Sequence, residues 1–261
     1  MATAAMTEPA RPENPRVNEI SLEQPWEWIS KGWEDLKRAP RFSLAYGAFF
    51  ALVSVLMTLG LLWEGLFFIV PSLAAGFFLV APLLGIGLYQ ISENLEDGRE
   101  VQFCQALQAW RRNEVQLSAM AVVLVLVLLA WMLSALVVFA LFFQSPVPTW
   151  ENFVPQVFLS GENNLFVAVG IVVGGAIAAF TFSISAITVP MLMDRQVDVV
   201  TAMRTSMEAV KKNWQAMTLW AALIVMFVGL GIVTYYVGLI VAMPLVGHAT
   251  WHAYRDLVPR D

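Results

Sequence analysis

The chain has 261 residues, of which 59% are hydrophobic and only 13% are charged. Soluble domains carry about 25% charged residues, so this composition excludes an ordinary soluble domain and predicts an integral membrane protein. The net charge of −5 gives no indication of a nucleic-acid partner.

The two ends of the chain are predicted to be cytoplasmic tails. Residues 1–18 are rich in proline and polar residues and lack the apolar core of a signal peptide, so we predict a flexible segment there. Residues 19–255 are predicted to form a single helical membrane domain, and residues 256–261 a second tail.

The first predicted helix follows Ser21, which can form a capping box with Gln24. Apolar residues then recur at spacings of three and four, which is typical of an amphipathic helix at a membrane surface. These residues are Trp26, Ile29, Trp33 and Leu36. The helix ends in the basic pair Lys37 and Arg38, and Pro40 breaks it.

Two apolar segments follow this helix, and each is near the roughly 20 residues needed to cross a bilayer core. They predict membrane spans over 42–62 and 66–91, joined by a tight turn at 63–65. The helix and its two spans make up a first unit, residues 21–91.

The same pattern recurs in a second unit, residues 97–193. Its amphipathic helix has Phe103, Leu107 and Trp110 in register and ends in the basic pair Arg111 and Arg112. Spans three and four are predicted over 115–143 and 165–193, with a proline-containing connection between them.

A third unit covers residues 197–254. The apolar face of its helix consists of Val200, Met203, Met207, Val210 and Trp214, and the basic pair is Lys211 and Lys212. The apolar region 216–247 is too long for one ordinary span, and turn-forming residues near its middle predict a break into spans five and six. The segment PLLGIGLYQ at 82–90 is echoed by PLVGHATWH at 244–252, which places the end of span six where span two ends.

Every Lys and Arg lies in the N-terminal segment, the second and third linkers or the C-terminal tail, and the three opposite connections have none. By the positive-inside rule, both termini and all three amphipathic helices are cytoplasmic. The predicted fold is therefore an all-α polytopic membrane protein. Six transmembrane helices form three pseudo-repeated hairpins, each preceded by a cytoplasmic amphipathic helix.

The basic pairs are candidate contacts for anionic lipid headgroups, where each cation contributes about 1 kcal/mol. The alternative is that they only set topology and favour the helix C-termini. The six residues are Lys37, Arg38, Arg111, Arg112, Lys211 and Lys212.

Span four carries a stripe of small residues, which predicts close packing against a neighbouring helix. The stripe consists of Gly170, Gly174, Ala178, Thr181, Ser185 and Thr188. The functional alternative is a polar groove in which the three hydroxyls contact a substrate.

His248 and His252 lie four residues apart, so they share one helix face and could supply two metal ligands. A third ligand would have to come from Glu93, Asp194 or Cys104. Histidines that hydrogen-bond to headgroups or helix ends are the commoner case, so we expect no metal and no cofactor.

No catalytic motif or pair of carboxylates at catalytic spacing is found in the sequence. Within the first four predicted spans and the turn between the first two, the only acid or base is Glu64 in that turn. Ion-coupled transporters and proton pumps need ionisable groups in the membrane, so the sequence predicts a non-enzymatic protein that is not ion-driven.

The segments at 16–47 and 244–258 resemble a family of bacterial integral membrane proteins known as domain of unknown function 2189. The resemblance implies a multi-pass protein of the bacterial cytoplasmic (inner) membrane. Some family members carry a cytochrome c oxidase label, which implies a respiratory oxidase as one partner. Two histidines on one helix do not supply the usual oxidase haem ligands, so such a link implies an accessory or assembly role.

We expect an accessory or organising factor that binds other membrane proteins or membrane lipid. The alternative is a transporter for a neutral or lipophilic small solute, with Thr181, Ser185 and Thr188 lining its path. The oligomeric state stays open at this point.

Overall fold

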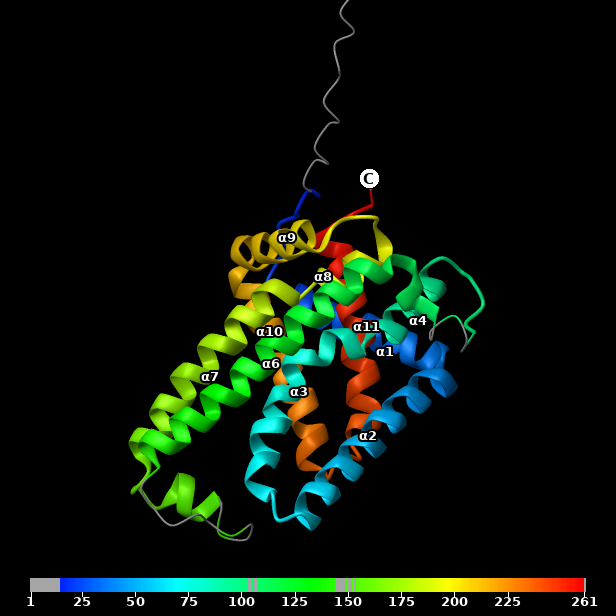
Figure 1. The fold of residues 1–261 in the computed structure, drawn as a ribbon. Helices are drawn as coiled ribbons and strands as arrows, with labels where there is room; N and C mark the ends of the chain where they lie inside the picture. Colours follow the sequence, from blue (N-terminus) through cyan, green and yellow to red (C-terminus); the bar gives the residue numbers. More distant parts are fainter. Residues whose placement is uncertain are drawn as a thin grey trace, which may run out of the picture.

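The computed structural model describes residues 15–102, 105, 108–143, 149, 152 and 154–260. Within these residues the secondary structure is helical and contains no strand, which confirms the all-α class. The helices run mostly along one direction, and α9 lies across one end of the molecule (Figure 1).

Among the described residues, four helical segments are long and apolar enough to cross a membrane. They are α2 (Pro40–Trp63), α6 (Glu114–Phe142) with the short η2 (Ala109–Asn113) before it, α7 (Asn164–Ser185) with α8 (Thr188–Asp194), and α10 (Trp214–Val233). A fifth exists if the bent pair α3 (Val70–Leu84) and α4 (Ile86–Glu96) counts as one span. The predicted multi-pass architecture is thus supported, with four or five spans in place of six.

These helices direct large apolar side chains away from the protein. On α2, Phe49, Leu52, Leu56 and Leu59 are all exposed and recur at spacings of three and four, so they form one outward stripe. An apolar surface of this extent is stable against lipid and unfavourable against water.

The second span is bent, whereas the sequence predicted one continuous span over 66–91. After the turn at Glu64 and Gly65 and the short η1 (Phe67–Ile69), α3 and α4 meet at an angle of 40° beside Gly85. Pro82 removes a helical hydrogen bond just before the bend. Tyr46 of α2 satisfies two backbone groups at the bend. Its hydroxyl donates to the Leu84 carbonyl at 2.7 Å and accepts from the Gly87 N–H at 3.3 Å.

The fourth span is interrupted between α7 and α8. Pro190 has no N–H to bond the Ala186 carbonyl, and the helix breaks at that level. At this break the Ile187 N–H donates to the hydroxyl of Ser206 on α9 (Val199–Lys212), at 3.4 Å. The predicted span over 165–193 is therefore present but jointed near its end.

The apolar region 216–247 does divide into two helices, and the break comes at 234–238, where Tyr235 and Tyr236 adopt positive φ angles. The last helix, α11 (Leu239–Leu257), is the reason that six spans are not confirmed. It is apolar only in its first half and almost entirely buried inside the protein. It packs against α1 (Gln24–Arg38), α2, α4 and α10.

Two glycines let α11 approach its neighbours closely. A Cβ atom on Gly47 of α2 would lie 2.3 Å from the backbone oxygen of Ile240, and one on Gly32 of α1 would lie 2.8 Å from the backbone nitrogen of Ala249. Neither distance is possible for a real side chain, so glycine is required at both contacts.

The predicted apolar faces of the two described surface helices are divided between buried and exposed residues. On α1, Trp28 and Gly32 are buried, while Trp26 and Trp33 of the predicted face are 53% and 44% exposed. On α9 the buried residues are the small Ala202, Thr205, Ser206 and Ala209, while Val200, Met207 and Trp214 are exposed. Each predicted apolar face is thus only partly exposed, because Ile29 and Leu36 of α1 and Met203 and Val210 of α9 pack inside the protein. The capping box at Ser21 is also not formed, since α1 has Glu23 as its N-cap and no side-chain cap. Of the second surface helix, Phe103, Cys104 and Leu107 lie outside the described residues.

One backbone geometry occurs at all three joints between a linker and the following span. The joint residues are Ala39 (φ −127°, ψ 53°), Asn113 (φ −148°, ψ 57°) and Asn213 (φ −115°, ψ 36°). They precede α2, α6 and α10, which correspond to the first span of each predicted unit.

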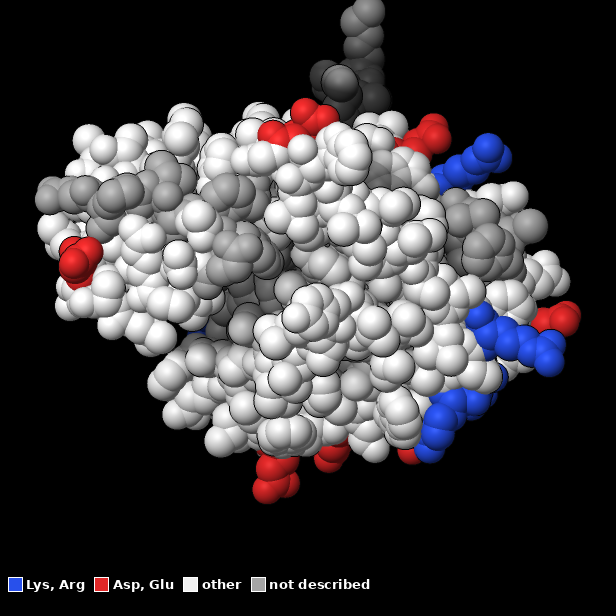
Figure 2. Space-filling model, turned by 90° about the horizontal axis from the view of Figure 1, so that it is seen from below, with Lys and Arg blue, Asp and Glu red and all other residues white. Residues whose placement is uncertain are grey.

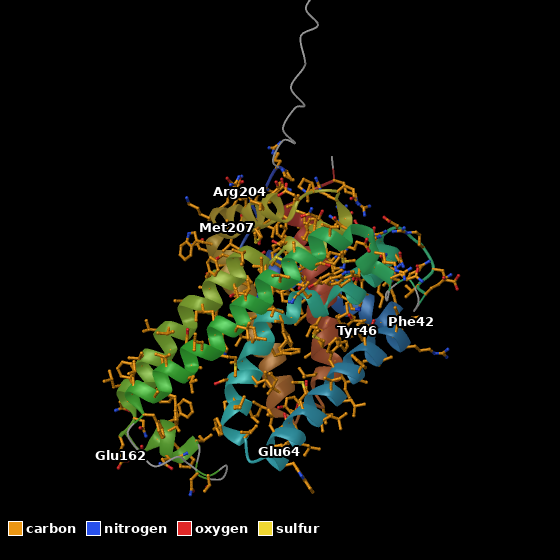
Figure 3. The ribbon with its side chains drawn as sticks, in the orientation of Figure 1. Phe42, Tyr46, Glu64, Glu162, Arg204 and Met207 are labelled. Atoms are coloured by element: carbon orange, nitrogen blue, oxygen red, sulfur yellow. The ribbon has the colours of Figure 1, made fainter. Side chains whose placement is uncertain are left out.

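Both ends of the packed chain lie near α9. Val17 is 3% exposed, and the Asn18 N–H donates to the Leu257 carbonyl at 2.9 Å. The packed domain therefore includes residues from both of the ranges predicted to be tails, 1–18 and 256–261. Arg204 and Met207 lie at this end, and Glu64 and Glu162 at the opposite end (Figure 3). Seen from that opposite end, most of the surface carries no charge, and the charged groups lie toward the rim (Figure 2).

Candidate functional site

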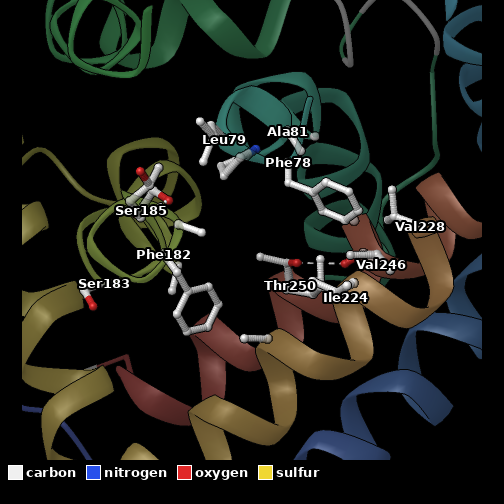
Figure 4. Close-up of a pocket in the computed structure, with 18 of the residues that line it drawn as sticks. Phe78, Leu79, Ala81, Phe182, Ser183, Ser185, Ile224, Val228, Val246 and Thr250 are labelled. Carbon is white, nitrogen blue, oxygen red and sulfur yellow. Dashed lines mark hydrogen bonds between the residues drawn. The ribbon is translucent and has the colours of Figure 1, made fainter. Parts of the chain in front are cut away.

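The main cavity of the described structure has a volume of about 430 Å³ and lies among α3, α4, α7, α10 and α11 (Figure 4). Its wall includes Phe78, Phe182, Ile224, Val228 and Val246. This volume falls within the range that small-molecule sites occupy.

The wall is almost entirely apolar. None of its described residues is Asp, Glu, Lys, Arg or His. Its hydroxyls mostly donate to carbonyls of their own helices: Thr181 to Ile177, Ser183 to Ala179, Ser185 to Thr181, Thr218 to Trp214 and Thr250 to Val246, each at 2.7 Å. A charged ligand would be unpaired in such a cavity, so the site favours an apolar one.

The cavity opens sideways between α7 and α10. Ala178 and Ala179 on α7, and Thr218 and Val225 on α10, line it and are also exposed. Residues on the other side of the cavity, such as Leu79 of α3 and Met243 of α11, are buried. The opening therefore faces the same surroundings as the outer faces of two spans.

The lining residues of each helix lie toward the α9 end. On α10 they run from Thr218 to Val228, a rise of about 15 Å. A bilayer hydrocarbon core is about 30 Å thick, so the cavity reaches through roughly one leaflet.

One tyrosine differs from the other polar groups of the wall. Tyr89 of α4 lines the cavity and is only 2% exposed, yet its hydroxyl makes no hydrogen bond with a described residue. The nearby Leu84 carbonyl at the helix bend is occupied by Tyr46. Tyr89 thus offers an O–H donor in an otherwise apolar wall.

The small-residue stripe of span four has four different environments. Ala178, Thr181 and Ser185 line the cavity. Gly174 lies under the ring of Trp131 on α6, where a Cβ atom would be 3.0 Å from the ring, whereas Gly170 has nothing within 4 Å. Thr188 is buried, and its hydroxyl lies 2.6 Å from the Ile184 carbonyl and 3.3 Å from the Ala202 carbonyl of α9.

The three basic pairs follow one rule. The second member of each pair bonds to the protein: Arg38 to the Leu95 carbonyl, Arg112 to Glu93, and Lys212 to the Val17 carbonyl. The first members, Lys37, Arg111 and Lys211, are exposed and make no hydrogen bond or ion pair with the described residues. The first members thus have no partner among the described residues, while Arg38 and Lys212 are exposed as well.

The two histidines are engaged inside the protein. The Nε2 and Nδ1 atoms of His248 lie 2.9 Å from the Ser43 hydroxyl and 2.8 Å from the Ser92 hydroxyl, so α11 is joined to α2 and α4. His252 Nε2 lies 2.9 Å from an Asp35 oxygen on α1. Within the described part of the chain, no three His, Cys, Asp or Glu side chains are placed to share a metal ion.

A layer of ion pairs closes the α9 end of the helices. On α4, Glu93 pairs with Arg112 and Glu96 pairs with Arg255 of α11. Asp194 of α8 accepts a 2.6 Å hydrogen bond from Tyr254. The sequence pattern alone does not identify Glu93 and Glu96 as internal partners of distant cations, because the arginines that pair with them lie elsewhere in the chain.

The spans and their apolar outer faces define a multi-pass integral membrane protein. Residues 69–194 match the model of a family described as a predicted integral membrane protein (DUF2189). The resemblance expected from the sequence is thereby confirmed over residues 69–194, which include α3 to α8. No curated protein and no solved structure matches the chain.

Proposed function

We propose that this protein is a non-enzymatic membrane protein that binds a lipophilic molecule from the bilayer and thereby organises lipid around itself. The observation that carries this proposal is the uncharged cavity of about 430 Å³ that opens between α7 and α10. A molecule already dissolved in the bilayer reaches such an opening by lateral diffusion, without crossing water.

The wall chemistry supports binding more than catalysis. A catalytic site needs ionisable or nucleophilic groups with a base in reach, and the described residues of the cavity wall include no acid, histidine or lysine. An apolar ligand gains van der Waals contacts by filling this cavity, since the atoms that line an empty volume have no partner on one side.

The proposed setting is the bacterial cytoplasmic membrane, with both termini and α9 on the cytoplasmic side. The distribution of Lys and Arg in the sequence supports this orientation. Lys37, Arg111 and Lys211 would then contact anionic headgroups, while the exposed Trp26, Trp33 and Trp214 would anchor the surface helices.

Filling the cavity tests the proposal. Ala221 lines it, whereas the adjacent Ala222 is exposed on the outer face of α10. We expect Ala221→Phe to lower the amount of lipid that co-purifies in native mass spectrometry at least severalfold, because the ring occupies the ligand volume. Ala222→Phe should retain the wild-type amount, since its ring points into lipid. Equal lipid occupancy in the two folded variants would contradict the proposal.

A transporter for a neutral or lipophilic solute is the second candidate, and the hydroxyls of Thr181 and Ser185 in the wall favour it. Thr188, the third residue of that predicted path, does not line the cavity. Solute flux through the purified protein in liposomes would support transport. Binding without flux would leave the lipid-organising role, including service as an accessory factor to a membrane complex.

A further inference from the structure

The Tyr89 side chain is 2% exposed, and its hydroxyl in the cavity wall makes no hydrogen bond with a described residue. Buried polar groups are nearly always hydrogen-bonded, so an unbonded hydroxyl in a cavity wall indicates a missing partner. A Cβ atom on Gly85 would lie 2.6 Å from the Tyr89 oxygen, which shows how closely the phenol lies against the bend. The Leu84 carbonyl at the bend already accepts a hydrogen bond from Tyr46 at 2.7 Å.

The position of Tyr89 along its helix indicates a depth in the bilayer. Glu93, which pairs with Arg112, follows Tyr89 by one helical turn. On α11, the cavity residue Thr250 is followed by Trp251, whose N–H donates to Glu96 at 2.9 Å. The charged layer therefore begins about one turn beyond the cavity, and Tyr89 lies just inside it.

In a glycerolipid, the acyl carbonyls lie at this same depth, between the charged headgroup and the hydrocarbon chains. The cavity extends from this level toward the middle of the membrane over about 15 Å, the length of one leaflet. Its opening between α7 and α10 would admit a chain sideways and leave the headgroup outside, near the exposed Lys211 that follows the lining residue Val210.

We propose that the ligand is an ester-linked glycerolipid of the leaflet on the α9 side, with one acyl chain in the cavity and its ester carbonyl accepting a hydrogen bond from Tyr89. This inference rests on the proposed function and names its ligand class. A purely apolar occupant would leave the Tyr89 donor unsatisfied, whereas an ester carbonyl satisfies it.

The experiment compares two lipids that differ only at the linkage. Full-length protein in detergent is titrated with a diester phosphatidylglycerol and with the diether lipid of the same headgroup and chain length, which has no carbonyl. Native mass spectrometry gives the apparent affinity for each. Wild-type protein should bind the diester about three- to tenfold more tightly. Tyr89→Phe should bind the two lipids equally, and Tyr235→Phe, at the exposed turn between α10 and α11, should keep the wild-type preference.

Equal wild-type affinity for the two lipids would overturn this inference, and so would a preference that survives in Tyr89→Phe. The wild-type comparison needs no variant, so it decides the matter even if Tyr89→Phe does not fold. Failure of the proposed function gives a different result, in which neither lipid binds or Ala221→Phe binds both as well as wild type. In a third outcome, Ala221→Phe lowers the affinity for both lipids equally and wild type shows no preference for the diester. The cavity would then bind lipid, but Tyr89 would not distinguish an ester from an ether linkage.

Discussion

Asp198 shows how a single side chain fixes a surface helix. Its carboxylate accepts hydrogen bonds from the backbone N–H groups of Val200 and Thr201 at 2.9 and 3.0 Å and from the Thr201 hydroxyl at 2.6 Å. The hydroxyl of Thr201, followed by these N–H groups, holds the pKa of Asp198 below its usual value of 3.8. The cap favours the ionised form and the folded state together.

This pKa shift has a definite sign in a stability measurement. Because the folded-state pKa is lowered, the contribution of Asp198 is complete above the unfolded-state pKa of about 4 and is lost as the pH falls through the folded-state value. At pH 7, Asp198→Ala should lower the free energy of unfolding by about 1 kcal/mol, whereas Asp198→Asn should retain most of the cap.

Thermal unfolding in detergent between pH 7 and pH 3 checks this expectation. Wild type should lose more stability over that range than Asp198→Asn, in which residue 198 no longer titrates. The same loss in both proteins would show that Asp198 does not contribute to the pH dependence.

The contact between α2 and α11 shows how elements of this fold depend on close approach. Gly47→Ala would place a methyl group 2.3 Å from the Ile240 carbonyl oxygen. The clash cannot be removed by a side-chain rotation, because the atoms in contact belong to the backbone of Ile240. We expect a loss of about 1–3 kcal/mol in the free energy of unfolding. Gly60 lies on the same helix with nothing within 4 Å, so Gly60→Ala should be neutral or stabilising. Thermal unfolding of the two variants side by side measures the difference, and equal stability would contradict the packing argument.

Hydrophobic patterning predicts the helices well because it depends on local spacing. It places α2 and α6 within two residues of their bounds. It does not predict which face of α1 or α9 is buried, since in a membrane protein the apolar face also has a favourable partner in lipid. Nor does it distinguish α11 from a span, because Leu239 to Gly247 are as apolar as a span although the protein surrounds them.

The cavity could not have been found from the sequence. Its walls come from helices that are far apart in the chain, and no spacing rule connects Tyr89 with Ala221 or Thr250. The small-residue stripe of span four is the one part of the cavity wall that the sequence pattern indicates. Its segment from Ala178 to Ser185 does line the cavity. The sequence also does not show that the Tyr89 hydroxyl lacks a partner, because this depends on the hydrogen bonds of the folded structure.

At the scale of the whole molecule, the α9 end and the opposite end are expected to lie on different sides of the membrane. Arg204 lies at the α9 end, and Glu64 and Glu162 lie at the other (Figure 3). In a chain with Cys104→Ser, we expect Glu64→Cys and Glu162→Cys to react with a membrane-impermeant maleimide in intact cells. Arg204→Cys should react only after the membrane is opened, because the positive-inside rule places α9 in the cytoplasm. The opposite labelling pattern would reverse the orientation.

The central position of α11 also governs the order in which the molecule can assemble. His252 meets Asp35 across 217 residues of chain, and His248 meets Ser43 across 205. While a ribosome is still producing the chain, α1, α2 and α4 are therefore already made but lack the helix that bonds to Asp35, Ser43 and Ser92. Translation thus delivers the centre of the structure last, and the earlier helices have to remain in a loosely packed state, open to membrane proteases and chaperones, until it arrives.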